Sequence, residues 1–318
     1  MITKEDRSAS NEINDRNVDI IDSAYIEDSF RQAGQNIKVL YKEETGSTNE
    51  DARAALKDAS VLVIADRQNA GRGRRGRDFY SPKGSGLYMS LALPYDQALF
   101  ETVKLTAIAA VAVAQSIDEE VFEGRDTALI KWVNDIYLKD RKVCGILCEA
   151  FLPAEDDKGC VVAGIGINVY APSGDFPEEI RDRAGYLVDN ALPGLRTRLA
   201  AAVIKRLFHY INEPDSALAV YRAKSNLMGC IVWINSFVPA ASPGLNGDST
   251  HGAVSAYGAG QTFDPDTAIN ADTAQTADSY NENTATVKGI DDEYRLLVEY
   301  ADGHTEALSS GEVSVVSI

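Results

Sequence analysis

The sequence has 318 residues, of which 45% are hydrophobic and 25% are charged, as in ordinary folded globular proteins. Its length favours two domains over one. The formal net charge of −17 repels nucleic acid, so we expect no DNA partner, and a phosphate site would have to be a local basic patch. The longest apolar stretch, 105–117, is interrupted by polar residues and is too short for a membrane span, so no membrane partner is expected.

Residues 1–35 are predicted to be an acidic N-terminal tail with one short helix near 21–30. No apolar run follows the first charges, as a secretory signal would require, so we expect a cytoplasmic protein. The four cysteines form no CxxC pair and, with three histidines, no metal-binding spacing. They are expected to be buried free thiols: Cys144, Cys148, Cys160 and Cys230.

Residues 36–228 carry the periodicities of an α+β domain. Ile37, Val39 and Tyr41 alternate with polar residues, as in a half-buried strand, whereas 61–65 is a continuous apolar run, as in a buried strand. The pattern predicts a mixed β-sheet with packed helices, all on one side of the sheet. Further strands are expected at 87–93, 128–132, 136–138, 142–151 and 160–170, and helices at 50–58, 101–122, 195–211 and 216–225.

Residues 229–318 are predicted to form a small C-terminal β-barrel. Between its first two strands lies a segment, 236–285, that is rich in Ala, Gly, Ser, Thr, Asn and Asp and has few large apolar groups to bury. We expect this segment to be a flexible low-complexity insertion. The barrel strands are expected at 230–234, 286–290, 294–300, 305–308 and 313–318, with turn residues between them.

Four arginines gather within six residues of this acidic protein: Arg72, Arg74, Arg75 and Arg77. Glycines between them let the backbone turn its amides toward an anion, and guanidinium groups bind phosphate bidentately. The glycines also satisfy the pattern GxGxxG, but no helix is expected after them, as a dinucleotide-binding fold would require. The segment therefore indicates a nucleotide phosphate site. A solvated basic loop and a binder of single-stranded nucleic acid are the alternatives.

Five motifs follow one another in an order known from one enzyme family. They are GRGRRG at 71–76, SP at 81–82, KWVND at 131–135, DRKVCGIL at 140–147 and GIGIN at 164–168. Together they resemble the biotin protein ligases. The resemblance implies a catalytic domain of the biotin/lipoate ligase type and a small C-terminal β-barrel.

The resemblance also implies an activity, its cofactors and a partner. Such an enzyme forms biotinyl-5′-adenylate from biotin and ATP with Mg²⁺. It then transfers biotin to a lysine of a biotin carboxyl carrier domain of a biotin-dependent carboxylase. It acts as a monomer or a homodimer.

The resemblance assigns roles to individual positions. The residues expected to hydrogen-bond biotin are Ser47, Thr48 and Gln68. The predicted catalytic residues are Lys142, which would contact the reacting carboxylate and phosphate, and Arg74 and Arg72, in the loop that would close over biotin and its adenylate. On the ATP side are Arg77, Lys131, Asn134 and, as the magnesium ligand, Asp135. The other predicted ligand-binding positions are Asn49, Gly71, Phe79, Gly145, Gly164, Gly166 and Asn168.

These residue types suit the reaction. A carboxylate that attacks the α-phosphorus of ATP brings an anion to an anion, and fixed positive charge offsets the repulsion. Gly164 and Gly166 would leave room for a ligand at the sheet. Plainer interpretations exist: Ser47 as a helix cap, Gln68 as a turn residue, a surface ion pair between Lys131 and Asp135, and the two glycines as strand bends.

The sequence departs from the family pattern at three places. Val133 replaces the proline of KWPND, and Phe79 stands where Trp is common, so that an N–H donor is lost. The tail before Ile37 lacks the basic recognition helix of the DNA-binding domain that some members carry, so we expect no repressor activity. Two other functions stay open, namely a lipoate protein ligase and a non-catalytic module that binds biotin or a nucleotide.

Overall fold

The protein is described by a computed structural model that covers residues 19–94, 101–152, 159–235, 284–309 and 311–316. The predicted tail is covered only from Asp19 onward, and the predicted insertion at 236–285 lies almost wholly outside the described residues. The predicted short helix is present as α1, Ser23–Gln32. Its first turn is capped by the side chain of Asp22, which accepts a hydrogen bond from the Tyr25 N–H.

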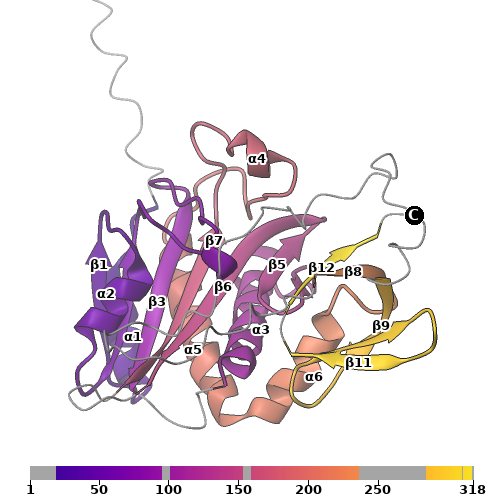
Figure 1. The fold of residues 1–318 in the computed structure, drawn as a ribbon. Helices are drawn as coiled ribbons and strands as arrows, with labels where there is room; N and C mark the ends of the chain where they lie inside the picture. The colour runs from indigo at the N-terminus through magenta and orange to yellow at the C-terminus, as the bar shows by residue number, and fades with distance from the viewer. Residues whose placement is uncertain (1–18, 95–100, 153–158, 236–283, 310, 317–318) are drawn as a thin grey trace, which may run out of the picture.

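A seven-stranded sheet forms the centre of the molecule (Figure 1), and the predicted mixed sheet is confirmed. Its first two strands run parallel and all other neighbours run antiparallel. In spatial order the strands are β1 (Ile37–Lys42), β2 (Ser60–Ala65), β3 (Gly86–Pro94), β7 (Cys160–Asn168), β6 (Arg141–Phe151), β5 (Asp135–Leu138) and β4 (Leu129–Lys131).

Helices cover both faces of this sheet, so the expectation of helices on one side is wrong. Strand β2 shows why, because it is apolar on both faces: Leu62 and Ile64 belong to the main core, whereas Val61 and Val63 pack in a second core with Ala52 of α2. The helices of the main-core face are α1, α3 (Thr102–Phe122), α5 (Leu195–Asn212) and α6 (Pro214–Lys224). Helix α2 (Thr48–Ala55) lies on the opposite face, and α4 (Glu178–Arg181) is a single turn.

The C-terminal strands form a separate antiparallel sheet, as predicted. Its order is β11 (Thr305–Leu308), β10 (Leu296–Tyr300), β9 (Thr284–Ile290), β8 (Ile231–Asn235) and β12 (Glu312–Val315). The two sheets are joined through Tyr294, whose carbonyl accepts a hydrogen bond from the Trp132 indole at 2.9 Å. The Tyr294 ring also meets the Tyr221 ring edge-on at 5.5 Å. The domain boundary near residue 228 stays a prediction.

Among the described helices, none combines the length and apolar character that crossing a membrane would need.

A buried ion pair ties α6 to α3. The Lys224 ammonium donates to the Asp118 carboxylate at 2.6 Å and also contacts Asp126 and the Ala128 carbonyl. Burial alone lowers the pKa of Lys224, but the hydrogen bonds and charges of the two aspartates outweigh it, so the pKa is raised and the ammonium stays charged. The pair fixes the helix beneath strand β4.

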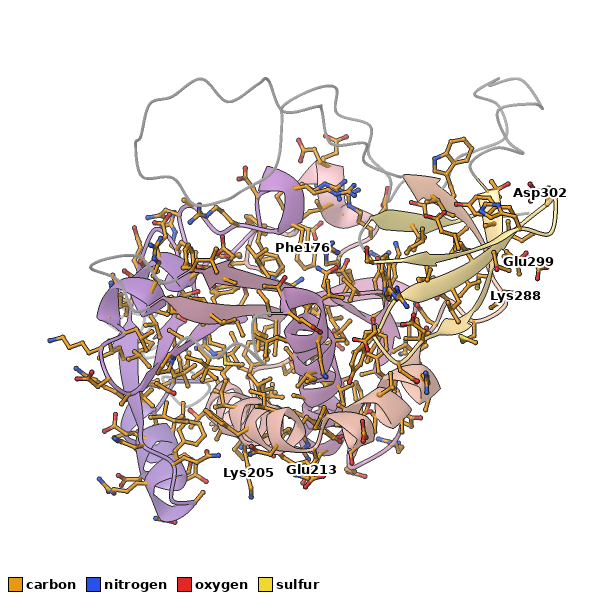
Figure 2. All side chains as sticks on the ribbon, turned by 60° about the horizontal axis from the view of Figure 1, so that its bottom comes forward. Phe176, Lys205, Glu213, Lys288, Glu299 and Asp302 are labelled. Carbon is orange, nitrogen blue, oxygen red and sulfur yellow. The ribbon has the colours of Figure 1, made fainter. Side chains whose placement is uncertain are left out.

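Removing this ammonium should destabilise the fold. Lys224→Ala leaves the Asp118 carboxylate buried without its counter-charge, which should lower the free energy of unfolding by about 3 kcal/mol in urea denaturation. The matched control is Lys205→Ala, because Lys205 points outward from α5 (Figure 2) and its loss should change stability by less than about 0.5 kcal/mol. Equal stability of the two variants would contradict the assigned role.

Candidate active site

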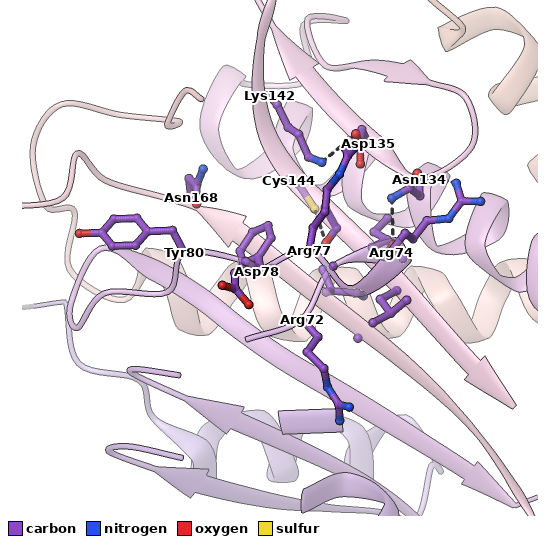
Figure 3. A pocket seen from close by; sticks show the side chains of 18 of the residues that line it. Arg72, Arg74, Arg77, Asp78, Tyr80, Asn134, Asp135, Lys142, Cys144 and Asn168 are labelled. Carbon is purple, nitrogen blue, oxygen red and sulfur yellow. Dashed lines mark hydrogen bonds and ion pairs between the residues drawn. The ribbon is translucent and has the colours of Figure 1, made fainter. Parts of the chain in front are cut away.

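One pocket gathers nearly all of the predicted site residues. It lies against β5, β6 and β7 on the α2 face of the large sheet (Figure 3). Of the predicted positions, only Gly71 does not line it. Those that do are Ser47, Thr48, Asn49, Gln68, Arg72, Arg74, Arg77, Phe79, Lys131, Asn134, Asp135, Lys142, Gly145, Gly164, Gly166 and Asn168.

The cations of the pocket already have partners within the protein. The Lys142 ammonium is 2.7 Å from Asp135 Oδ2, and Arg74 donates to Asn134 Oδ1 at 3.1 Å. Arg72 pairs with Glu50 of α2 and extends away from the Lys142–Asp135 pair (Figure 3). Asp135 pairs with Lys142 on the neighbouring strand, and the surface ion pair between Lys131 and Asp135 stays a prediction.

The arginine segment is a loop that folds on itself. Residues Arg74–Gly76 form a single 3₁₀ turn, and no α-helix opens there, which agrees with the rejection of a dinucleotide site. The Gly73 N–H donates to Arg77 O at 2.7 Å, and the Phe79 N–H donates to Gly71 O at 2.8 Å. A Cβ on Gly71 would lie 2.7 Å from Phe79 O, so this glycine permits the close turn rather than facing the pocket.

The space left by the strand glycines is filled by protein side chains. A Cβ on Gly166 would lie 2.4 Å from the Phe79 ring, and one on Gly164 would lie 2.1 Å from Asn49 Oδ1. Both glycines line the pocket, and their role in leaving room for a ligand at the sheet stays a prediction. They leave room for Phe79 and Asn49, and any ligand would lie over those two side chains.

Polar groups converge at the N-terminal end of α2. Ser47 precedes the helix, but its side chain makes no capping hydrogen bond, so the cap interpretation fails and its hydroxyl stays at the pocket. The N–H of Thr48, the first residue of the helix, donates instead to Gln68 Oε1 at 2.9 Å. Gln68 Nε2 donates to Ser81 Oγ at 3.1 Å, which links α2 to the end of the arginine loop.

Sequence reasoning missed one wall of the pocket. The segment that contains α4 contributes Phe176, Ile180 and Arg183, and it is held to β6 by the Lys142 N–H, which donates to Arg183 O at 2.7 Å. No motif marks this segment, although its aromatic and basic residues directly after GIGIN were a usable signal. Other pocket residues that the sequence did not indicate include Tyr80, Trp132, Cys144, Ile146 and Leu147. Val313 of β12 and Gly311, which directly precedes that strand, also line the pocket.

The two cysteines of β6, Cys144 and Cys148, are not activated as nucleophiles. All four are free, as predicted, but only Cys144 and Cys160 are buried, and the other two are half-buried. Cys144 lines the pocket, yet burial raises its pKa, and burial raises that of Cys148 to about 12. A thiolate is the reactive form, so neither thiol is activated.

Asp135 is the acidic side chain best placed for a metal ion. Its Oδ1 is buried and has no hydrogen-bond partner within the described part of the chain. No cluster of three or more acidic, cysteine or histidine side chains occurs among those residues. Magnesium fits such a site, because it keeps several waters and takes one or two carboxylates together with substrate phosphates.

Comparison with known proteins agrees with this architecture. Residues 38–168 match the model described as the biotin/lipoate A/B protein ligase family, and residues 280–316 match the biotin protein ligase C terminal domain. A bifunctional ligase/repressor BirA from Bacillus spizizenii is 43% identical over 155 residues, which cover 48% of this chain and 46% of that protein. The chain thus spans about half the length of this relative.

Two further proteins match over more of the chain. A biotin--[acetyl-CoA-carboxylase] ligase from Mycobacterium tuberculosis is 29% identical over 220 residues, covering 66% of this chain and 79% of that one. A solved biotin protein ligase from Aquifex aeolicus, in complex with biotin and ATP, gives a TM-score of 0.62 at 22% identity and covers 88% and 99% of the two chains. This likeness shows a shared fold. Residues 38–168 are thus similar to the biotin/lipoate A/B protein ligase family, and residues 280–316 to the C-terminal domain of biotin protein ligases.

Proposed function

We propose that this protein is a biotin protein ligase that activates biotin with ATP and transfers it to a lysine of a carrier domain. The observation that carries the proposal is the cationic pocket in which Lys142, Arg74 and Arg77 gather. In the first step the biotin carboxylate attacks the α-phosphorus and pyrophosphate leaves. In the second step the lysine amine attacks the activated carbonyl, loses a proton, and AMP leaves.

Lys142 is the residue best placed to bring the two anions together. The Lys142 ammonium lies beside the Asp135 carboxylate, near the starts of strands β6 and β5. Because the Lys142 side chain is only 30% exposed, its charge acts in a partly desolvated site. An incoming carboxylate or phosphate competes with Asp135 for the ammonium. The positive charge then stabilises the five-coordinate phosphorus, where negative charge accumulates.

The arginine loop supplies the rest of the positive charge. Arg74 is held by an amide rather than a carboxylate, so little is lost when it turns to a phosphate. Phe79 lies between the loop and the sheet, where its ring offers a face for stacking. Closing the loop over the adenylate would exclude water and protect the mixed anhydride from hydrolysis.

The Mg²⁺ that ATP brings would be held through Asp135 and the phosphate oxygens. The ion would neutralise phosphate charge during the attack on the α-phosphorus. Asn134 stabilises the turn next to Asp135. Its Nδ2 donates to Ile146 O at 3.1 Å, and its Oδ1 accepts from Arg74.

The relatives support biotin, ATP and a carrier domain as the ligands. The Mycobacterium relative is named for acetyl-CoA carboxylase, whose biotin-bearing part is a carrier domain, and the Aquifex structure contains biotin and ATP. On charge grounds we also propose that the chain does not bind DNA. The resemblance to biotin protein ligases supports a monomer or a homodimer.

An assay with the complete components tests the activity. We expect the protein, with Mg²⁺, ATP and a carrier domain, to add the mass of biotin but not that of lipoate to the carrier. Lys142→Ala and Arg74→Ala should each lower kcat about 10²–10³-fold, because each removes one charge that stabilises the transition state. The matched control Arg31→Ala, on the exposed surface of α1, should leave the rate unchanged.

The possible outcomes separate the candidates. Lipoate transfer would identify a lipoate protein ligase, and binding of biotin without any transfer would identify a non-catalytic module. Unchanged rates in both pocket variants would contradict the roles proposed for Lys142 and Arg74.

The role of Asp135 can be measured through magnesium. Asp135→Asn removes the carboxylate charge that would hold the ion, so the Mg²⁺ concentration giving half-maximal rate should rise at least about tenfold. Asp28→Asn, on α1, is the control and should leave the magnesium dependence unchanged. A rate loss in Asp135→Asn at every magnesium concentration, with no shift of the curve, would limit Asp135 to the ion pair with Lys142.

A further inference from the structure

Four polar side chains form a continuous line, of which Asn49, Thr48 and Gln68 line the pocket and Ser90 lies behind them. Asn49 Oδ1 lies 2.6 Å from Ser90 Oγ, and Ser90 Oγ lies 2.7 Å from Thr48 Oγ1. Thr48 Oγ1 lies 3.0 Å from Gln68 Oε1. Ser90 is fully buried in the middle of β3, and no sequence motif marks it.

The two ends of this line can only accept hydrogen bonds. At one end, Asn49 Nδ2 donates to Glu149 Oε2 at 2.7 Å, which turns the Asn49 oxygen toward Ser90. At the other end, Gln68 Oε1 already accepts the Thr48 N–H, and Gln68 Nε2 points to Ser81. Flipping either amide would set a donor against a donor or an oxygen against a carboxylate.

The line has one proton fewer than it needs to make a hydrogen bond at every oxygen–oxygen contact. Three oxygen–oxygen contacts join four atoms, but only the hydroxyls of Ser90 and Thr48 carry a proton, and each hydroxyl has one. Asn49 Oδ1 can only accept, so the single Ser90 proton goes to it. The Thr48 proton is then assigned to Ser90, because that contact, at 2.7 Å, is shorter than the 3.0 Å contact of Thr48 with Gln68. The contact between Thr48 Oγ1 and Gln68 Oε1 is left with lone pairs on both sides.

We propose that Ser90 and Glu149 are positioning residues that make Thr48 and Gln68 present oxygen lone pairs to a substrate N–H. Glu149 fixes the orientation of the Asn49 amide by accepting a hydrogen bond from its Nδ2. Ser90 then donates to Asn49 Oδ1 and Thr48 donates to Ser90, so the Thr48 proton points away from the pocket. A ligand N–H offered to Thr48 Oγ1 supplies the missing proton. The inference rests on the proposed function, in which the donor is a ureido N–H of biotin.

The glycine on β7 agrees with this arrangement. A Cβ on Gly164 would overlap Asn49 Oδ1, so the strand is shaped around the amide that starts the line. Because Thr48 is only 4% exposed and Gln68 is half-buried, water has limited access to the oxygens of these two side chains. A buried acceptor without a hydrogen bond destabilises the free protein relative to the complex, in which the ligand N–H would satisfy it.

The test replaces Ser90 in the full-length enzyme. In Ser90→Ala the Thr48 hydroxyl loses its partner and donates to Gln68 instead, so the site satisfies itself and a ligand N–H gains less. The KM for biotin should rise about fivefold to tenfold with little change in kcat, because one neutral hydrogen bond far from the reacting carboxylate is affected. Ser116→Ala is the matched control, since it removes another buried serine hydroxyl, which donates to Ala112 O within α3.

A biotin analogue with a methylated ureido nitrogen separates positioning from mere stability. The wild-type enzyme should prefer biotin over this analogue in kcat/KM, and Ser90→Ala should reduce that preference by the same fivefold to tenfold. Ser116→Ala should keep the wild-type preference. Ser90→Cys, which keeps the side-chain volume but donates weakly, should lie between the two and serves if the alanine variant does not fold.

Equal losses for biotin and the analogue, or an unchanged KM for biotin, would overturn the positioning role while leaving the ligase activity intact. If the wild-type enzyme itself adds no biotin to the carrier, the proposed function fails, and the assignment of Ser90 fails with it.

Discussion

The pocket depends on keeping positive charge in a partly buried place before any anion has arrived. An isolated charge there would cost several kcal/mol, so each cation needs a partner inside the protein. Lys142 has Asp135, Arg72 has Glu50, and Arg74 has the amide of Asn134. In the proposed reaction the substrates therefore bind by exchange, replacing protein partners with their own carboxylate and phosphates.

Lys142 can serve in this exchange because its backbone is held from both sides. It belongs to β6, which is paired with β5 and β7, and its N–H and carbonyl bond to the segment that carries α4. Only the side chain is left to change partners. Arg72 has the opposite arrangement, since it sits on a loop and pairs with an exposed glutamate, where an ion pair contributes little.

Much of the fold and the site could be predicted from the sequence because each signal was local. The apolar run at β2 and the long alanine-rich helix α3 follow from patterns of neighbouring residues, and five motifs fixed most of the pocket. The second core beneath α2 could not be assigned, because a continuous apolar run does not say which helix covers which face. Ser90 could not be identified for a similar reason, since the role of a serine within a strand depends on its contacts with Asn49 and Thr48 of α2, which packs on that face of the sheet.

The place at which the chain leaves and re-enters the C-terminal sheet has a consequence for evolution. Strands β8 and β9 are antiparallel neighbours, with Trp233 opposite Thr284, so the two ends of the intervening stretch sit side by side. The entropy of closing a loop between fixed ends grows only with the logarithm of its length. Lengthening or trimming this stretch therefore costs little and need not alter the strand register or the pocket, which makes it a natural point for fusing a tag or another domain.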